Sequence, residues 1–228
     1  MDADVTGWER YREQISSLSK LDFNYDVKTY HETKDKSGWN VDRHHALLTV
    51  EPAGEPVSNG AFESVCDCLR RYKFPDPKLI SVAFDPSSDL RGRNILMHAH
   101  FAGFTFTFGV RVTGVIDEVR VNQAGHEARV WGYSYRTLKG HFEIGEITFE
   151  VSKDLVTGVI EFEINSYSRP DRIPNLFFRI GFILFGRMLQ SHFAHSSMKR
   201  LREVAERALA ASGTRSQAAP PEFTEAKP

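Results

Sequence analysis

The chain has 228 residues, of which 41% are hydrophobic and 26% charged, a composition typical of a globular protein with a sizeable core. Its 29 basic and 30 acidic side chains give a formal net charge of −1, which excludes a strong overall attraction to nucleic acid or an anionic membrane. The N-terminus is acidic and polar and lacks the apolar core of a secretory signal, so we expect a cytoplasmic protein.

The first predicted element is an amphipathic helix over residues 6–21. Thr6 and Glu9 fit a capping box at its start. Its apolar side chains recur at spacings of three and four, at Trp8, Tyr11, Ile15 and Leu18. We interpret residues 1–24 as a helical extension that precedes the main domain.

Residues 22–60 are rich in charge, glycine and proline, and we interpret them as an ordered extension with turns. A second helix is expected from about residue 59 to residue 72, ended by the two prolines that follow. This helix carries both cysteines of the chain, Cys66 and Cys68. Their i, i+2 spacing on a helix turns them apart, so we predict neither a disulfide nor a metal site there.

Alternating polar and apolar residues predict a series of strands after this helix. The clearest alternation places Phe104, Phe106, Phe108, Val110 and Val112 on one face of a strand, with polar residues opposite. Such a pattern is typical of an antiparallel sheet with one apolar and one wetter face. The predicted strands cover residues 80–84, 95–101, 104–112, 128–137, 144–152 and 158–167.

The periodicity becomes helical after Asp171 and continues to about Leu209, which predicts one long helix of about 50 Å. Its first half is apolar almost all round, but it is too short to span a bilayer and is interrupted by Arg179 and Arg187. The segment from residue 211 to residue 228 is rich in proline, serine and alanine and is expected to be a disordered tail.

This order of elements predicts an α+β fold in which a curved antiparallel sheet of six or seven strands grips a long C-terminal helix. The helix is the element large enough to cover the apolar face of the sheet. We expect a single domain over residues 25–210, and a cavity between strand 104–112 and helix segment 176–189. Phe104, Phe106, Phe108 and Phe182 would contribute to its walls.

The segment from Trp131 to Pro170 carries a resemblance to a known family. Its run from Tyr135 to Glu146 reads Y-R-T-L-K-G-H-F-E-I-G-E. In this run and around it, the chain resembles the domain of unknown function 1990 family, found in bacteria and plants, over roughly residues 25–205. The resemblance implies a relationship to START and Bet v 1-like helix-grip proteins, but it implies no reaction.

Three side chains of this segment could carry chemistry, namely His141, Glu143 and Glu146. An imidazole and two carboxylates can ligate a metal or form an acid/base pair. The structural alternative, which we favour, is that Gly140 and Gly145 take positive φ, His141 caps the loop and the glutamates pair with arginine. We accordingly predict no metal and no cofactor.

Three further residues are candidate contacts to a ligand. Tyr135 and Thr137 share one face of their strand, so their hydroxyls could reach the polar head of a ligand. Arg169, at the entrance to the long helix, could hold an anion. The alternative for Arg169, which we favour, is a salt bridge to Glu143 or Glu146. His98 and His100 also share a strand face, but no third metal ligand accompanies them.

These patterns support three hypotheses on function. The preferred one is non-catalytic binding of a hydrophobic small molecule, such as a lipid or isoprenoid, in the cavity. The second is an enzyme with a site around His141, Glu143 and Glu146. The third is peripheral membrane or protein association through residues 176–189. The motifs of P-loop, dinucleotide-binding, zinc-protease and serine-hydrolase enzymes are absent from the sequence, which disfavours those reactions.

Overall fold

The computed structural model describes residues 5–33, 38–101, 103–171 and 176–212, and it leaves aside the side chains of residues 5, 6, 101 and 176–191. Seven antiparallel strands form one sheet in the order β1-β7-β6-β5-β4-β3-β2. The strands are β1 Asn40–Val50, β2 Ile80–Ala83, β3 Asn94–Phe101, β4 Phe104–Val121, β5 Glu127–Thr137, β6 Glu143–Asp154 and β7 Val159–Pro170. The helices are η1 Val5–Tyr11, α1 Arg12–Leu18, α2 Lys28–Glu32, α3 Ala61–Arg70 and α4 Leu176–Ala211.

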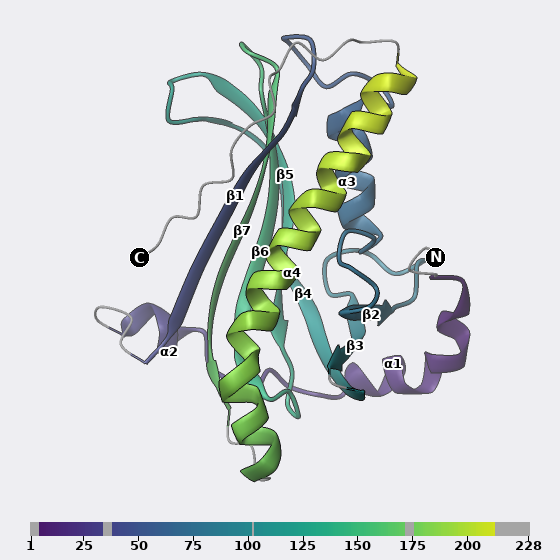
Figure 1. Cartoon of the computed structure of the whole chain (residues 1–228), viewed down its shortest axis with the longest axis vertical. Helices are drawn as coiled ribbons and strands as arrows, with labels where there is room; N and C mark the ends of the chain where they lie inside the picture. The colour runs from purple at the N-terminus through teal and green to yellow at the C-terminus, as the bar shows by residue number, and fades with distance from the viewer. Residues whose placement is uncertain (1–4, 34–37, 102, 172–175, 213–228) are drawn as a thin grey trace.

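The predicted helix-grip architecture is confirmed. The long helix α4 crosses one face of the curved sheet, and α3 lies beside its C-terminal half on the same side (Figure 1). We call this face of the sheet the inner face and the opposite one the outer face. The predicted disordered tail lies outside the described residues beyond residue 212.

Strand β1 corrects the interpretation of residues 22–60 as an extension of turns. It pairs with β7 along the edge of the sheet, with His44 opposite Ile164. Its inward side chains Ala46 and Leu48 are buried, whereas its outward residues Val41, Arg43 and His45 are exposed. Because only the C-terminal half of this edge strand buries apolar side chains, its sequence shows little alternation of hydropathy.

The N-terminal helix also differs from its prediction, since it consists of the 3₁₀ helix η1 followed by the short α-helix α1. Thr6 and Gly7 are poor formers of α-helix, which fits the 3₁₀ geometry of this part. The predicted apolar spacing is confirmed, because Ile15 and Leu18 are buried and Trp8 and Tyr11 pack against the same cluster.

The core fills the half of the inner face that faces α3 and the C-terminal half of α4, which is the upper half in Figure 1. Side chains of α3 and of the C-terminal half of α4 pack there against the middle strands, and one cross-sheet row is completely covered: Trp131, Val151, Phe162 and Ala46. Phe74, which follows α3, contacts Phe149 and Phe162 within this core. The helices therefore close this half of the sheet with tightly packed rings.

The N-terminal segment covers the outer face. Leu18 of α1 lies so close to β4 that a Cβ at Gly109 would be 2.4 Å from its Cδ2 atom. Further along, Tyr30 of α2 stacks on Tyr167 of β7 at 3.6 Å between ring centroids. Within the described residues, no helix combines the length and the apolar character needed to cross a membrane.

Candidate functional site

The β5–β6 turn, which lies within the run from Tyr135 to Glu146, is held by contacts to the N-terminal segment. The Asn24 side-chain amide donates to the Glu143 carbonyl at 2.8 Å, and the Thr137 hydroxyl donates to Asn24 Oδ1 at 2.6 Å. Leu138 is completely buried against α1, and the Lys139 ammonium pairs with Asp22 at 2.8 Å. These contacts give the turn a structural role, and they occupy the Thr137 hydroxyl that was a candidate ligand contact.

His141 caps this turn, as the structural alternative predicts. Its Nδ1 atom accepts a hydrogen bond from the Glu143 backbone N–H at 2.9 Å. The ring packs against Phe108, with centroids 4.3 Å apart, and is 8% exposed. Burial lowers the pKa of His141 to about 3, so the imidazole is neutral at physiological pH. It holds the turn as a neutral hydrogen-bond acceptor.

The structure separates Glu146 from the other two residues of the candidate acid/base site. Glu143 and Glu146 differ in parity along β6, so their side chains leave the sheet on opposite faces. Glu146 lies on the outer face, 3.6 Å from the Arg136 guanidinium, and also accepts a hydrogen bond from Thr113. Burial raises the pKa of Glu146, and the nearby Arg136 charge opposes this shift. His141 and Glu146 therefore do not share a site.

Two of the structural expectations for this segment need correction. Arg169 does not pair with Glu143 or Glu146; its guanidinium carbon lies 4.6 Å above the ring of Trp39. Gly140 takes positive φ, as expected, but Gly145 does not. A side chain at Gly145 would instead collide with the neighbouring strand, because a Cβ there would lie 2.2 Å from the Tyr167 carbonyl oxygen. This glycine permits a close approach of two backbones.

The phenylalanines proposed as a cavity wall occupy different environments. Phe108 is buried, Phe106 is partly buried against the core, and Phe104 is 53% exposed at the start of β4. Phe182 lies on α4, where its side chain is outside the described residues, as are those of the whole segment 176–189 proposed for membrane contact.

Below the completely buried rows, the inner face carries a row that is only partly covered. It consists, across four strands, of Tyr135, Ile147, Ser166 and Asp42. The row above it, towards the core, contains Tyr133, Phe149 and Ile164, all of which are buried. The change from covered to partly covered side chains takes place at Tyr135.

Tyr135 has a partner that sequence reasoning missed. Its hydroxyl lies 3.1 Å from the hydroxyl of Tyr72, which follows α3 and is 2% exposed. Tyr72 has φ of 54°, a backbone conformation that is uncommon for residues with side chains. Burial raises the pKa of both tyrosines. Since 63 residues separate them, the sequence offered no signal for this pair.

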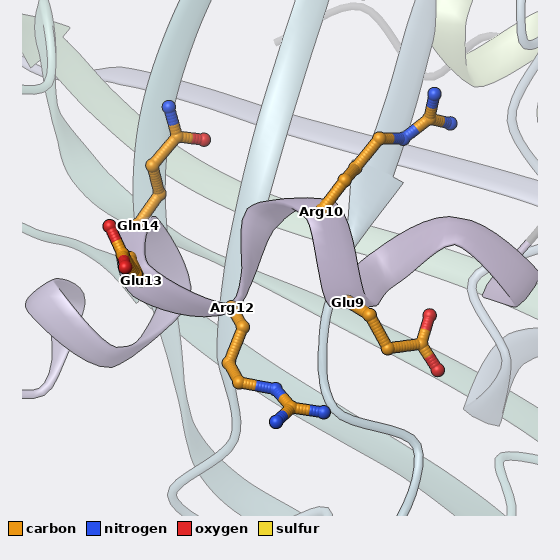
Figure 2. A pocket seen from close by; sticks show the side chains of 5 residues that line it. All are labelled: Glu9, Arg10, Arg12, Glu13 and Gln14. Carbon is orange, nitrogen blue, oxygen red and sulfur yellow. The ribbon is translucent and has the colours of Figure 1, made fainter.

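The other candidates do not assemble into a site. His98 and His100 bond to Thr107 and Thr105 of the adjacent strand, and the described residues contain no group of three metal-ligating side chains. A surface hollow of about 550 Å³ lies beside η1 and α1. Figure 2 shows Arg10 and Gln14 on one side of the helical segment and Arg12 on the other, so its polar groups do not converge.

The fold, with a curved antiparallel sheet that holds a long C-terminal helix, defines a helix-grip protein. The chain belongs to the family described as domain of unknown function 1990 (DUF1990), whose sequence profile matches residues 25–200. No curated protein matches it significantly.

Several solved structures are similar to this chain. Ara h 8.0201 is 10% identical with a TM-score of 0.41, over 75% of this chain and 99% of that one. The Zhui aromatase/cyclase from Streptomyces sp. R1128 is 13% identical with a TM-score of 0.47, over 78% and 99%. Norcoclaurine synthase from Thalictrum flavum is 11% identical with a TM-score of 0.42, over 72% and 95%. These similarities are too remote to indicate a shared ligand or reaction.

Proposed function

We propose that the protein binds a hydrophobic small molecule, of lipid or isoprenoid type, between the lower half of the inner face and α4. The observation that carries this proposal is the environment of Tyr135. Burial raises the pKa of its hydroxyl, yet the residue as a whole is only partly buried. Both properties are expected of a side chain that borders an internal space and not bulk solvent.

The surroundings of Tyr135 favour an apolar ligand. Phe149 contacts it from the core with ring centroids 5.8 Å apart, and Ile147 is its cross-strand neighbour. Phe108 of β4 packs on Phe142 of the β5–β6 turn, with ring centroids 5.0 Å apart. The apolar side chains of this surface come from β4, β5 and β6, whereas Ser166 of β7 and Asp42 of β1 lie at the other end of the row. A mostly apolar wall with a few polar groups is typical of sites for apolar molecules.

The role proposed is binding without catalysis. His141 is neutral and accepts a backbone hydrogen bond, and Glu146 lies on the outer face beside Arg136. An acid/base mechanism needs such groups within hydrogen-bond reach of one substrate. The described positions of His141 and Glu146 do not meet this condition.

The test is saturable binding of the neutral fluorescent probe N-phenyl-1-naphthylamine. We expect Ile147→Trp, which fills the proposed space, to weaken binding at least about tenfold while the far-ultraviolet circular dichroism stays unchanged. Val41→Trp is the matched control, because Val41 lies on the outer face of β1 and is 45% exposed. Absence of saturable binding, or equal binding by folded Ile147→Trp, would refute the proposal.

A further inference from the structure

Two tyrosine hydroxyls meet where the completely buried core ends. Tyr72 reaches the site from the turn after α3, and Tyr135 from β5, with 3.1 Å between their oxygens. Tyr72 is enclosed, whereas Tyr135 borders the space proposed for the ligand. The pair is therefore the polar group that a bound molecule would meet on this side of the site.

The hydrogen bonds of this pair leave one donor unused. Two hydroxyls bring two hydrogens, and the bond between them uses one. The described contacts include no further hydrogen bond for either hydroxyl. Either hydroxyl could be the donor, but donation from the enclosed Tyr72 to the Tyr135 oxygen is the arrangement that leaves no donor of Tyr72 unpaired. In that arrangement the hydrogen of Tyr135 remains for an acceptor on a ligand. By contrast, Tyr133 donates to the Leu69 carbonyl at 3.1 Å.

A ligand that displaces water from this hydroxyl without supplying an acceptor leaves the donor unpaired, which is costly, so a ligand that brings an acceptor oxygen gains affinity over one that does not. The negative charge of Glu143 near the pair favours a neutral acceptor over an anionic one. Glu143 leaves β6 on the inner face, and its charge raises the pKa of Tyr135 further, beyond the effect of burial. A second negative charge beside this carboxylate would be unfavourable.

We infer that the Tyr72–Tyr135 pair recognises a neutral acceptor oxygen, such as that of a ketone, ester or quinone, on an otherwise apolar ligand. This inference rests on the proposed function and narrows the ligand class. It favours carbonyl-bearing molecules over both plain hydrocarbons and fatty acids. Hydroxyl donors of this kind discriminate strongly because they are left unpaired by a ligand that lacks the acceptor.

The test compares three probes of matched chain length at pH 7: 2-tridecanone, tridecane and tridecanoic acid. Each displaces N-phenyl-1-naphthylamine from the protein. We expect the wild-type chain to bind the ketone about five- to tenfold more tightly than the alkane, and more tightly than the acid. The isosteric double variant Tyr72→Phe/Tyr135→Phe should lose this preference and keep its affinity for the alkane.

Tyr133→Phe is the matched control, because its hydroxyl is already bonded to a backbone carbonyl, and it should keep the preference for the ketone. Equal affinities for ketone and alkane in the wild type, or tighter binding of the acid, would overturn the inference and leave the proposed function intact. An unchanged preference in the folded double variant would overturn it as well. Failure of all three probes to displace the fluorophore would overturn both proposals.

Discussion

His141 illustrates how burial sets the protonation state of a single residue and links it to stability. Its pKa falls from 6.5 to about 3 in the folded protein. As the pH falls below 6.5, the unfolded chain takes up a proton that the folded chain does not, so the free energy of unfolding decreases. Between pH 7 and pH 5 this effect amounts to roughly 2 kcal/mol.

We therefore predict that the free energy of unfolding of His141→Gln falls by about 2 kcal/mol less than that of the wild type between pH 7 and pH 5. Glutamine can still accept the bond from the Glu143 N–H through its carbonyl oxygen. Urea unfolding at both pH values measures the difference. His192→Gln is the control, since His192 is exposed, and it should leave the pH dependence unchanged. An equal loss of stability in His141→Gln would show that another group causes it.

Lys153 and Glu51 form an ion pair in which neither side chain is exposed, with 2.8 Å between Nζ and Oε2. Glu51 also accepts the backbone N–H of Phe62 at the start of α3. Removing the ammonium leaves this carboxylate buried with one partner fewer. We predict that Lys153→Met lowers the free energy of unfolding by about 3–5 kcal/mol.

The matched comparison for Lys153→Met is Arg43→Met, which breaks the exposed pair between Arg43 and Glu163. That substitution should cost less than about 1 kcal/mol, because solvent screens exposed charges. Urea denaturation at pH 7 measures both variants. Similar costs for the two would mean that burial does not set the energy of these pairs.

The contact between α1 and β4 is the element-scale feature on which the outer face depends. A Cβ at Gly109 would lie 2.4 Å from Leu18 Cδ2, so Gly109→Ala must displace α1 or the Leu18 side chain. We predict a loss of about 1–2 kcal/mol in the free energy of unfolding. Leu18→Ala in the same chain should recover part of it, and a double-mutant cycle measures the coupling. Additive costs would contradict direct contact.

Regular elements with strong periodicity could be predicted from the sequence. The alternation in β4 and β6 and the helical spacing in α3 each reflect a local pattern with one buried side. Strand β1 could not be predicted in this way. It is an edge strand, and its charged residues pair with residues of β7, as Arg43 does with Glu163. Its identity follows from tertiary pairing.

The candidate site divides in the same way. The capping role of His141 could be predicted, because its partner Glu143 is two residues away. The environment of Arg169 could not, since its partner Trp39 comes from a distant part of the chain. The Tyr72–Tyr135 pair was missed for the same physical reason: side chains far apart in sequence meet only when the sheet closes over α3.

At the scale of the whole molecule, the two faces of the sheet have separate tasks. The inner face holds the core and the space proposed for a ligand, and the outer face is covered by the N-terminal segment. The family profile begins at residue 25, and the sequence predicts a helical extension over residues 1–24. The contacts join this extension to the domain, because Ile15 and Leu18 share a cluster with Leu96 and Leu138.

We predict that a fragment of residues 25–228 is less stable than one of residues 5–228 by roughly 3–6 kcal/mol, the value of two buried aliphatic side chains. The truncation also removes the Leu18 carbonyl, which accepts a hydrogen bond from the Arg111 guanidinium at 2.7 Å. Loss of this bond should add to the loss of stability. Urea unfolding compares the two fragments. Hydrogen exchange should then localise the loss to β3, β4 and the β5–β6 turn, because these elements contact the removed segment. Equal midpoints would instead establish residues 1–24 as an independent extension.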